Sequence, residues 1–383
     1  ARAIIDAHAG RERASGGRTP LFLYLALQCA HSPNSPDSYG ALYAGHRYTP
    51  DFADYNGMVS ALDDAVGNVT DALRAASMWS SSLVLFASDN GGPTAESVSG
   101  SSANNYPLRG GKHTAWEGGV RGLAWLSGGA LPPRARGSIR RGYVHIVDWY
   151  ATFLGLAGAE IGEINAQIGD DVTDAPSMPP VDSIDMWAYL AGHVSTSPRH
   201  EVPIASRYAD VARESDVQDE PPRGSAALIV GRYKLVRFEQ QYCFWTGPLY
   251  PNHTTTHAAE EPCDCGAHGC LYDIIADPSE TADLAARLPE VAARLRSRAE
   301  ELDATAIDAV MPEGWRGHNN GTAYCEAADA RWGGWWGPDM DGDGAFGSAS
   351  GAPAPTTLAL STQTAVLGPA RQTRLLSSRQ SSL

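Results

Sequence analysis

Long hydrophobic runs and a surplus of positive charge are both missing from this sequence of 383 residues. The longest apolar stretches, LFLYLAL and LVLF, are strand-sized and fall short of the ~18 residues that a membrane-spanning helix needs, so we predict no membrane span. Acidic residues outnumber basic ones by 44 to 29, giving a formal net charge of −15. Because nucleic-acid affinity comes from clustered lysine and arginine, this charge argues against a nucleic-acid partner.

Cysteine is sparse but concentrated. Four of the six cysteines fall within 28 residues: Cys243, Cys263, Cys265 and Cys270. N-glycosylation sequons begin at Asn68, Asn252 and Asn320. Together these features predict disulfides in an oxidising, secretory setting. A zinc site built from CDCGAHGC and His268 is the alternative, although its cysteine spacings do not fit the usual paired ligands. The N-terminus lacks both an initiator methionine and the residue order of a signal peptide, so it reads as a cut or processed end.

The first part of the chain has the pattern of an α/β protein. The run LFLYLALQ at 21–28 has no alternation, which predicts a strand buried on both faces of a mainly parallel sheet. Apolar residues at three- and four-residue steps predict an amphipathic helix over 53–77, and SLVLFAS predicts a second buried strand. A right-handed crossover places the C-terminal ends of such strands at one sheet edge. His31 and the pair Asp89–Asn90 follow these two strands, so they are candidates to converge there.

The pattern of apolar runs and the composition divide the rest of the chain into regions. VRGLAWLSG predicts another strand, and HIVDWYATFLGLAG predicts a helix closed by a glycine. We therefore assign residues 1–200 to an α/β domain. From 201 to 344, short apolar runs followed by a helix near 281–302 suit a smaller α+β domain with an antiparallel sheet. Residues 345–383 are rich in serine, alanine, threonine, proline and glycine, which predicts a disordered tail.

Residues 87–125 gather the groups that could carry chemistry. Asp89 and Asn90 offer hard oxygen donors suited to Ca²⁺ or Mg²⁺, although Asx-Gly after a strand is also an ordinary turn. Lys112 is one of only two lysines in the chain and lies between glycines and WEGG, where a compact cation could bind a sulfate or phosphate oxygen. Four residues near Lys112 are expected to shape and brace its loop: His113, Trp116, Glu117 and Arg121.

The ordered series of blocks in this chain resembles the formylglycine-dependent type I sulfatases, in particular the arylsulfatase B or N-acetylgalactosamine-4-sulfatase branch. The blocks run from residue 21 to about 280: PLFLYLALQCAHSP, MVSALDDAVGNVTDAL, LVLFASDNGG, YPLRGGKHTAWEGGVRG, VDWYATFLGLAG, IDMWAYL, IVGRYKLV and LYDIIADPSE. A phosphomonoesterase or phosphodiesterase of the same superfold is the alternative enzyme, since a fold does not fix the ester. Only the sulfatase pattern places a lysine in GGKHTAWEGG.

The resemblance implies an alkaline-phosphatase-like α/β fold and hydrolysis of sulfate esters, of a sulfated carbohydrate or an aryl sulfate. It implies calcium, with Asp89 and Asn90 among its ligands, and a formylglycine nucleophile made by the formylglycine-generating enzyme. Lys112 matches the sulfate-binding lysine, and His31 matches the histidine that contacts the sulfate or the leaving-group oxygen. A lysosomal or extracellular location is expected.

The sequence departs from the family at the nucleophile. Cys-x-Pro-x-Arg, the motif that carries formylglycine in the family, occurs nowhere in it, and the early Asp-Asp pair of the calcium site is missing too. ARAIIDAH resembles the helix that directly precedes the PLFLYLAL strand, so we expect a C-terminal portion of a sulfatase that is inactive alone. A non-catalytic secreted scaffold or glycan-binding protein is the alternative.

Overall fold

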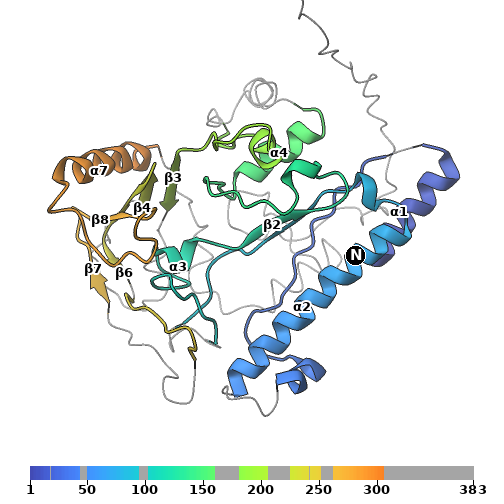
Figure 1. Cartoon of the computed structure of the whole chain (residues 1–383), viewed down its shortest axis with the longest axis horizontal. Coiled ribbons are helices and arrows are strands. Elements are labelled where there is room, and N and C mark those ends of the chain that lie inside the picture. The colour runs from blue at the N-terminus through green and yellow to red at the C-terminus, as the bar shows by residue number, and fades with distance from the viewer. Residues whose placement is uncertain are drawn as a thin grey trace, which may run out of the picture. The chain divides into compact units, whose positions relative to one another are not determined.

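The computed structural model describes most of the first 305 residues (Figure 1). The described ranges are 1–17, 19–43, 50–94, 102–159, 181–205, 225–240, 242–251 and 262–305. The chain divides into two compact units, Ala1–Ala306 and Ile307–Leu383, and every described residue lies in the first. The predicted domain boundaries at residues 200 and 344 stay predictions, and the predicted tail at 345–383 lies outside the described residues.

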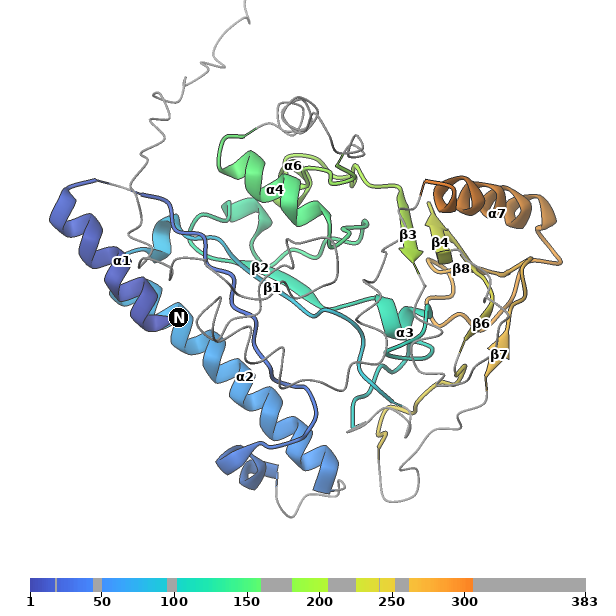
Figure 2. The same cartoon turned by 180° about the vertical axis from the view of Figure 1, so that it is seen from behind.

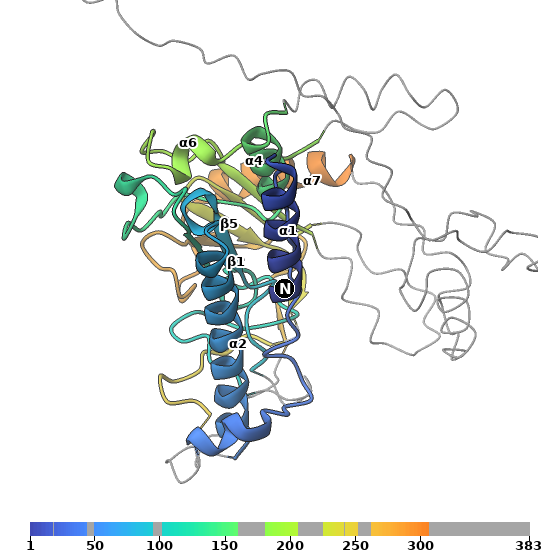
Figure 3. The same ribbon diagram turned by 90° about the vertical axis from the view of Figure 1, so that its right-hand side faces the viewer.

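Two helices pack side by side at the start of the chain (Figure 3). They are α1 (Arg2–Ser15) and α2 (Pro50–Ala75). Gly16 ends α1 in the left-handed conformation, with φ 66°, which glycine adopts without strain. Buried Ile5 of α1 contacts buried Ala72 and Leu73 of α2. The helix predicted over 53–77 is confirmed, shifted by two to three residues.

The strand predicted at 21–28 is not a hydrogen-bonded strand in the structure. Leu21 and Leu23 pack against the α1–α2 cluster, whereas Phe22 and Tyr24 are 72% and 81% exposed. Alternate side chains of an extended segment point to opposite faces, so one face is covered at the start of the run, whereas Leu25 and Leu27 further along are 42% and 39% exposed. The prediction of burial on both faces is therefore wrong for this part of the chain.

The other strands of the first half are confirmed. Strand β1 (Val84–Ala87) pairs antiparallel with β2 (Ala124–Ser127), with Val84 opposite Ser127. This pairing differs from the mainly parallel sheet predicted for this region, and every strand pair within the described residues is antiparallel. Phe86 stacks on Trp125 across this pair. The glycine-terminated helix is also confirmed as α4 (Asp148–Leu156), followed by Gly158 at φ 87°. Short helical turns complete this region: η1 (Asp37–Tyr43), η2 (Trp79–Ser81), α3 (Glu117–Val120), η3 (Pro133–Ala135) and α6 (Trp187–Leu190).

An antiparallel sheet of four strands forms the second half, as predicted. Its order is β3 (Glu201–Ala205), β4 (Ser225–Val230), β5 (Tyr233–Val236) and β8 (Cys270–Asp273). The turn between β4 and β5 is Gly231–Arg232, with Gly231 at φ 60°. The last helix, α7 (Pro289–Asp303), begins later than the predicted residue 281, because proline is tolerated in the first turn of a helix and not in its interior.

The two faces of this sheet have different partners. On one face, Leu235 of β5 and Leu271 of β8 pack against Ala292 and Leu295 of α7, which lies along the sheet in Figures 1 and 2. Residues next to these two in sequence point to the opposite face. There Val236 and Tyr272 form a cluster with Trp116. The sheet therefore supports the segment that contains Lys112.

Two disulfides confirm the predicted use of cysteine. They join Cys243 to Cys263 and Cys265 to Cys270, so the zinc alternative does not hold for these four residues. The first bridge lies next to the short pair of β6 (Glu239–Gln240) and β7 (Cys263–Asp264). Among the helices described here, none is both long and apolar enough to cross a membrane.

Candidate active site

Asp89 and Asn90 lie two and three residues beyond the end of β1. The Asn90 backbone N–H donates to Asp89 Oδ1 at 2.8 Å, and Asn90 Nδ2 donates to Gly91 O at 2.7 Å. These bonds form the local turn that Asx-Gly sequences favour. They also leave Asn90 Oδ1 as the ligand atom of its amide, beside the exposed carboxylate of Asp89.

Glycines bring this turn against the Lys112 segment. Gly91 N–H donates to Gly119 O at 2.8 Å, and a Cβ placed on Gly91 would lie only 1.7 Å from Gly118 O. A Cβ on Gly118 would lie 2.4 Å from Arg109 O. Since no side chain fits in such gaps, residues 89–92 and 109–119 pack backbone against backbone.

Lys112 is held through its backbone on two sides. Its N–H donates to Gly92 O at 3.2 Å, and its carbonyl oxygen accepts a hydrogen bond from the Tyr242 hydroxyl. The first bond places Lys112 beside the Asp89–Asn90 turn, and the second ties it to the chain before the Cys243–Cys263 bridge. Lys112 is half-buried, so part of the residue is open to solvent.

His113 follows Lys112 in the left-handed conformation, with φ 73°. Burial lowers the pKa of His113, and the positive charge of Lys112 lowers it further. A lowered pKa keeps the imidazole neutral at pH values where an ordinary histidine begins to gain a proton. His113 therefore adds no positive charge next to Lys112 at such pH values.

His31 lies in the loop after the extended run 21–28. It is exposed, its N–H donates to Gln28 O at 2.9 Å, and its Nδ1 lies 2.7 Å from Ser32 O. These bonds stay within its own loop. Convergence of His31 with Asp89, Asn90 and Lys112 therefore stays a prediction.

Three buried charged side chains, Glu117, Lys234 and Glu280, form an ion triad that supports the Lys112 segment. Lys234 Nζ lies 2.9 Å from Glu117 Oε1 and 2.8 Å from Glu280 Oε1, and Glu280 Oε2 accepts the Glu117 backbone N–H at 2.7 Å. All three side chains are at most 4% exposed. Burial raises the pKa of Glu280, although the charge of Lys234 opposes this rise. The triad joins α3 to β5 and to the chain after β8.

The expected bracing role of Trp116 and Glu117 is consistent with their burial, but sequence reasoning missed Lys234 and Glu280. A usable clue existed for Lys234: it is the second of only two lysines and lies within the apolar strand sequence YKLV. A buried charge of this kind requires a partner of opposite sign. No comparable clue marks Glu280, because its place depends on the turn that follows β8.

The described oxygen donors show how far the site could hold a calcium ion. Asp89 and Asn90 provide hard oxygens, which fit the ion, but calcium takes six to eight such ligands. Within the described ranges, no group of three or more histidine, cysteine, aspartate or glutamate residues could hold a metal. The pair therefore fits part of a calcium site and would need further oxygen ligands.

The predicted glycosylation sites are only partly visible. Asn68 is exposed on α2, so its side chain is open to solvent. Asn252 and Asn320 lie outside the described residues. Attachment of a glycan at any of the three stays a prediction.

Comparisons with known proteins identify the family. The sequence profile named Sulfatase matches residues 12–159, which include Asp89, Asn90 and Lys112. The chain carries a sulfatase family domain. Similar curated proteins include Arylsulfatase J from Mus musculus, 31% identical over 305 residues that cover 76% of this chain and 47% of the relative. Arylsulfatase A from Homo sapiens is 28% identical over 285 residues, which cover 72% of this chain and 47% of the relative.

The sulfatase domain is also similar to N-acetylgalactosamine-6-sulfatase from Sus scrofa, 31% identical over 160 residues, or 41% of this chain and 28% of the relative. Membership of the 4-sulfatase branch stays a prediction. The chain spans about half the length of the first curated relatives, 47% in each case.

Solved structures give the fold of the sulfatase domain. The PsFucS1 sulfatase from Pseudoalteromonas sp. matches with a TM-score of 0.52 and 22% identity, covering 79% of this chain and 52% of that one. Ps i-CgsB in complex with k-i-k-neocarrahexaose matches with a TM-score of 0.52 and 22% identity. The match covers 78% of this chain and 55% of that one. The predicted alkaline-phosphatase-like α/β fold is confirmed by these neighbours.

Proposed function

We propose that this chain is part of a sulfuric ester hydrolase that cleaves a sulfate ester of a sugar and binds the sulfate group at Lys112. The observation that supports this most is the hydrogen bond from Lys112 N–H to Gly92 O. It holds the backbone of Lys112 beside the turn formed by Asp89, Asn90 and the glycines that follow them. A cation and a part of a metal site at one edge suit a substrate with several anionic oxygens.

The roles of the chain's own residues follow from charge. Hydrolysis of a sulfate ester breaks the bond between sulfur and the sugar oxygen, and negative charge grows on that oxygen. Lys112 binds the sulfate oxygens and offsets their charge, in a site where a fixed cation needs no rearrangement. His31 is proposed to donate a proton to the departing sugar oxygen, which requires it to approach Lys112 in the complete protein.

Calcium and formylglycine complete the proposal. Asp89 and Asn90 would hold the calcium ion together with ligands outside the described residues. The ion supplies charge stabilisation for sulfate, and formylglycine supplies the nucleophile. The two disulfides support a secretory location, lysosomal or extracellular.

The substrate class rests on similarity to named relatives. One relative is an N-acetylgalactosamine-6-sulfatase, and one structural neighbour is in complex with neocarrahexaose. A sulfated carbohydrate is therefore favoured over a simple aryl sulfate. A second candidate function is a non-catalytic sulfated-glycan binder, favoured by the lack of Cys-x-Pro-x-Arg in the sequence.

Release of inorganic sulfate by the protein at its natural length tests the proposal. We expect release from a panel of sulfated saccharides, with the unsulfated saccharides as blanks. Release from 4-nitrophenyl sulfate alone would contradict the sugar substrate. Binding of sulfated saccharides without any release would favour the glycan binder, and neither binding nor release would contradict both functions.

A further inference from the structure

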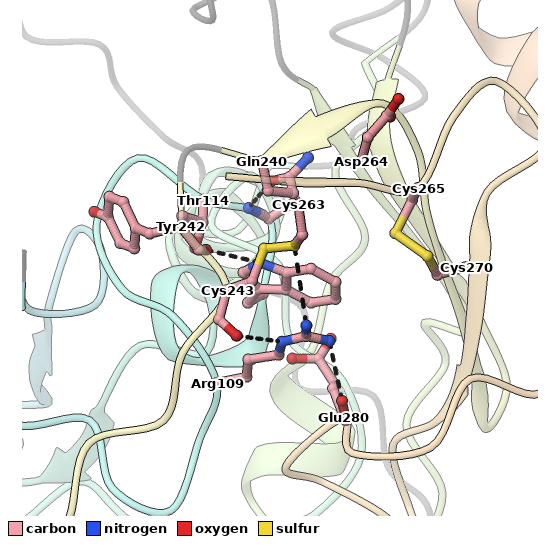
Figure 4. Close-up of a disulfide and its surroundings, with 12 residues drawn as sticks. Arg109, Thr114, Gln240, Tyr242, Cys243, Cys263, Asp264, Cys265, Cys270 and Glu280 are labelled. Carbon is pink, nitrogen blue, oxygen red and sulfur yellow. Dashed lines mark hydrogen bonds between the residues drawn. A yellow bond between two sulfur atoms is a disulfide. The ribbon is translucent and has the colours of Figure 1, made fainter. Parts of the chain in front are cut away.

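The Lys112 segment is fixed by the chain around one disulfide (Figure 4). Gly110 N–H donates to Phe244 O at 2.9 Å, and Ala115 N–H donates to Gln240 Oε1 at 2.8 Å. Trp116 Nε1 donates to Tyr242 O at 3.1 Å. These three hydrogen bonds join the Lys112 segment to one stretch of chain on either side of Cys243.

Arg109 connects this stretch to the disulfide. Its Nε donates to Cys243 O at 3.2 Å, and its Nη2 lies 3.9 Å from Cys263 Sγ. Its Nη1 donates to Glu280 O at 3.2 Å and to the Tyr272 hydroxyl at 3.1 Å. One planar guanidinium group therefore contacts both cysteines of the bridge and the turn that carries Glu280 of the ion triad.

Aromatic rings hold the guanidinium group in place. Its carbon lies 3.8 Å from the centre of the Trp116 ring and 4.6 Å from that of Trp245. Stacking on indole rings restricts arginine to one orientation, and the fork of N–H groups then matches carbonyl acceptors that a lysine could not reach together. Arg109 is thereby fixed only three residues before Lys112.

We propose that Arg109 and the Cys243–Cys263 disulfide position Lys112 for sulfate binding, an inference that rests on the proposed function. The disulfide fixes the carbonyl groups of residues 242–244, Arg109 and Gly110 dock on them, and the Tyr242 hydroxyl holds the carbonyl group of Lys112. Arg109 touches no substrate in this scheme. It acts through the backbone of the Lys112 segment, which a hydrogen bond from Lys112 N–H to Gly92 O holds beside the Asp89–Asn90 turn.

The second disulfide provides a matched control. Cys265–Cys270 spans a sequence separation of only five residues, against 20 for Cys243–Cys263, and Arg109 contacts Cys263 and Cys243 rather than this pair. The two double variants are Cys243→Ala with Cys263→Ala, and Cys265→Ala with Cys270→Ala. Each removes one bridge from the same region of the full chain.

Amide hydrogen exchange tests positioning without any ligand. Losing the first bridge should speed exchange at Gly110, Ala115 and Glu117 by about tenfold, the effect of losing one hydrogen bond. Losing the second should leave these amides unchanged. Exchange at Leu73, in the distant α1–α2 cluster, reports whether the fold survives. Equal exchange at the three amides in both double variants would overturn the proposal.

Arg109 variants decide the matter even if the first double variant fails to fold. Arg109→Met removes the cation and the fork, whereas Arg109→Lys keeps the cation. The measurement is the concentration of inorganic sulfate that halves the rate at which Lys112 is acetylated. We expect this concentration to rise about tenfold in Arg109→Met, because a small misplacement of a binding group can have an effect of this size. The rise should be smaller in Arg109→Lys. Unchanged half-protection in Arg109→Met would overturn the proposal.

The two readouts separate the inference from the function on which it rests. If inorganic sulfate does not protect Lys112 in the unaltered chain, the proposed function fails. The exchange comparison between the two double variants still decides whether the disulfide fixes the Lys112 segment.

Discussion

Replacing Lys234 with methionine is expected to lower the free energy of unfolding by about 3–5 kcal/mol, the usual cost of removing one partner from a buried ion pair. The variant leaves Glu117 and Glu280 buried beside each other with no ammonium group between them. Partial rescue is expected from adding Glu280→Gln, because this removes one uncompensated charge. Urea denaturation at pH 7 gives the measurement.

The loss should depend on pH in a defined direction. Burial already raises the pKa of Glu280 above its ordinary value, and removing Lys234 should raise it further. A carboxyl group whose pKa is raised in the folded state binds protons more tightly there than in the unfolded state. The contribution of this group to the free energy of unfolding is therefore most favourable below its pKa in the unfolded state. It declines as the pH rises through its pKa in the folded state. The difference in free energy of unfolding between the variant and the unaltered protein should widen as the pH rises above 4.5, the ordinary pKa of a glutamate.

A surface cation serves as the control for this experiment. Arg232 pairs with Asp273 at the β4–β5 turn, but its side chain is 52% exposed, and such pairs add little to stability. Arg232→Met should therefore change the urea midpoint far less than Lys234→Met. Similar losses in the two variants, or a loss for Lys234→Met that does not vary with pH, would contradict the role assigned to the triad.

Replacing Lys112 with alanine is expected to lower kcat/KM for sulfate ester hydrolysis by about 100- to 1,000-fold, as removal of one stabilising donor does in other active sites. The backbone of half-buried Lys112 is held beside the Asp89–Asn90 turn by its hydrogen bond to Gly92 O, which the substitution keeps. The fold should therefore persist. Initial rates with the best substrate of the saccharide panel, in the protein at its natural length, give the measurement.

Arg294 offers a matched loss of positive charge far along the chain. It is exposed on α7 and contacts neither the Lys112 segment nor its support in any described hydrogen bond. Arg294→Ala should keep full activity. An activity for Lys112→Ala within about twofold of the unaltered protein, well under the effect of a lost donor, would show that Lys112 is not the sulfate-binding group.

Much of the local structure was predictable because periodicity is a local property. The three- and four-residue steps of 53–77 predict α2, and the apolar runs around Val84 and Ala124 predict β1 and β2. The run at 21–28 shows the limit of this reasoning. An apolar run predicts an extended conformation, but hydrogen bonding in a sheet depends on a neighbour that lies elsewhere in the chain.

The candidate site was only partly predictable for the same reason. Asp89, Asn90 and Lys112 stand out by residue type and spacing, and the structure joins them through Gly92. The glycines allow close backbone contact, since a Cβ on Gly91 would lie 1.7 Å from Gly118 O. The support formed by Arg109, Lys234 and Glu280 joins segments more than 100 residues apart, which no local pattern reveals.

The central claim, that Lys112 binds a sulfate ester, is tested most directly by amine labelling. The chain has only two lysines: Lys112 is half-buried, and Lys234 is fully buried. Acetic anhydride should therefore modify Lys112 in the folded protein and Lys234 only after unfolding. We expect 4-nitrophenyl sulfate to slow acetylation of Lys112 while 4-nitrophenol does not. Equal acetylation of Lys112 with and without the sulfate ester would contradict the claim.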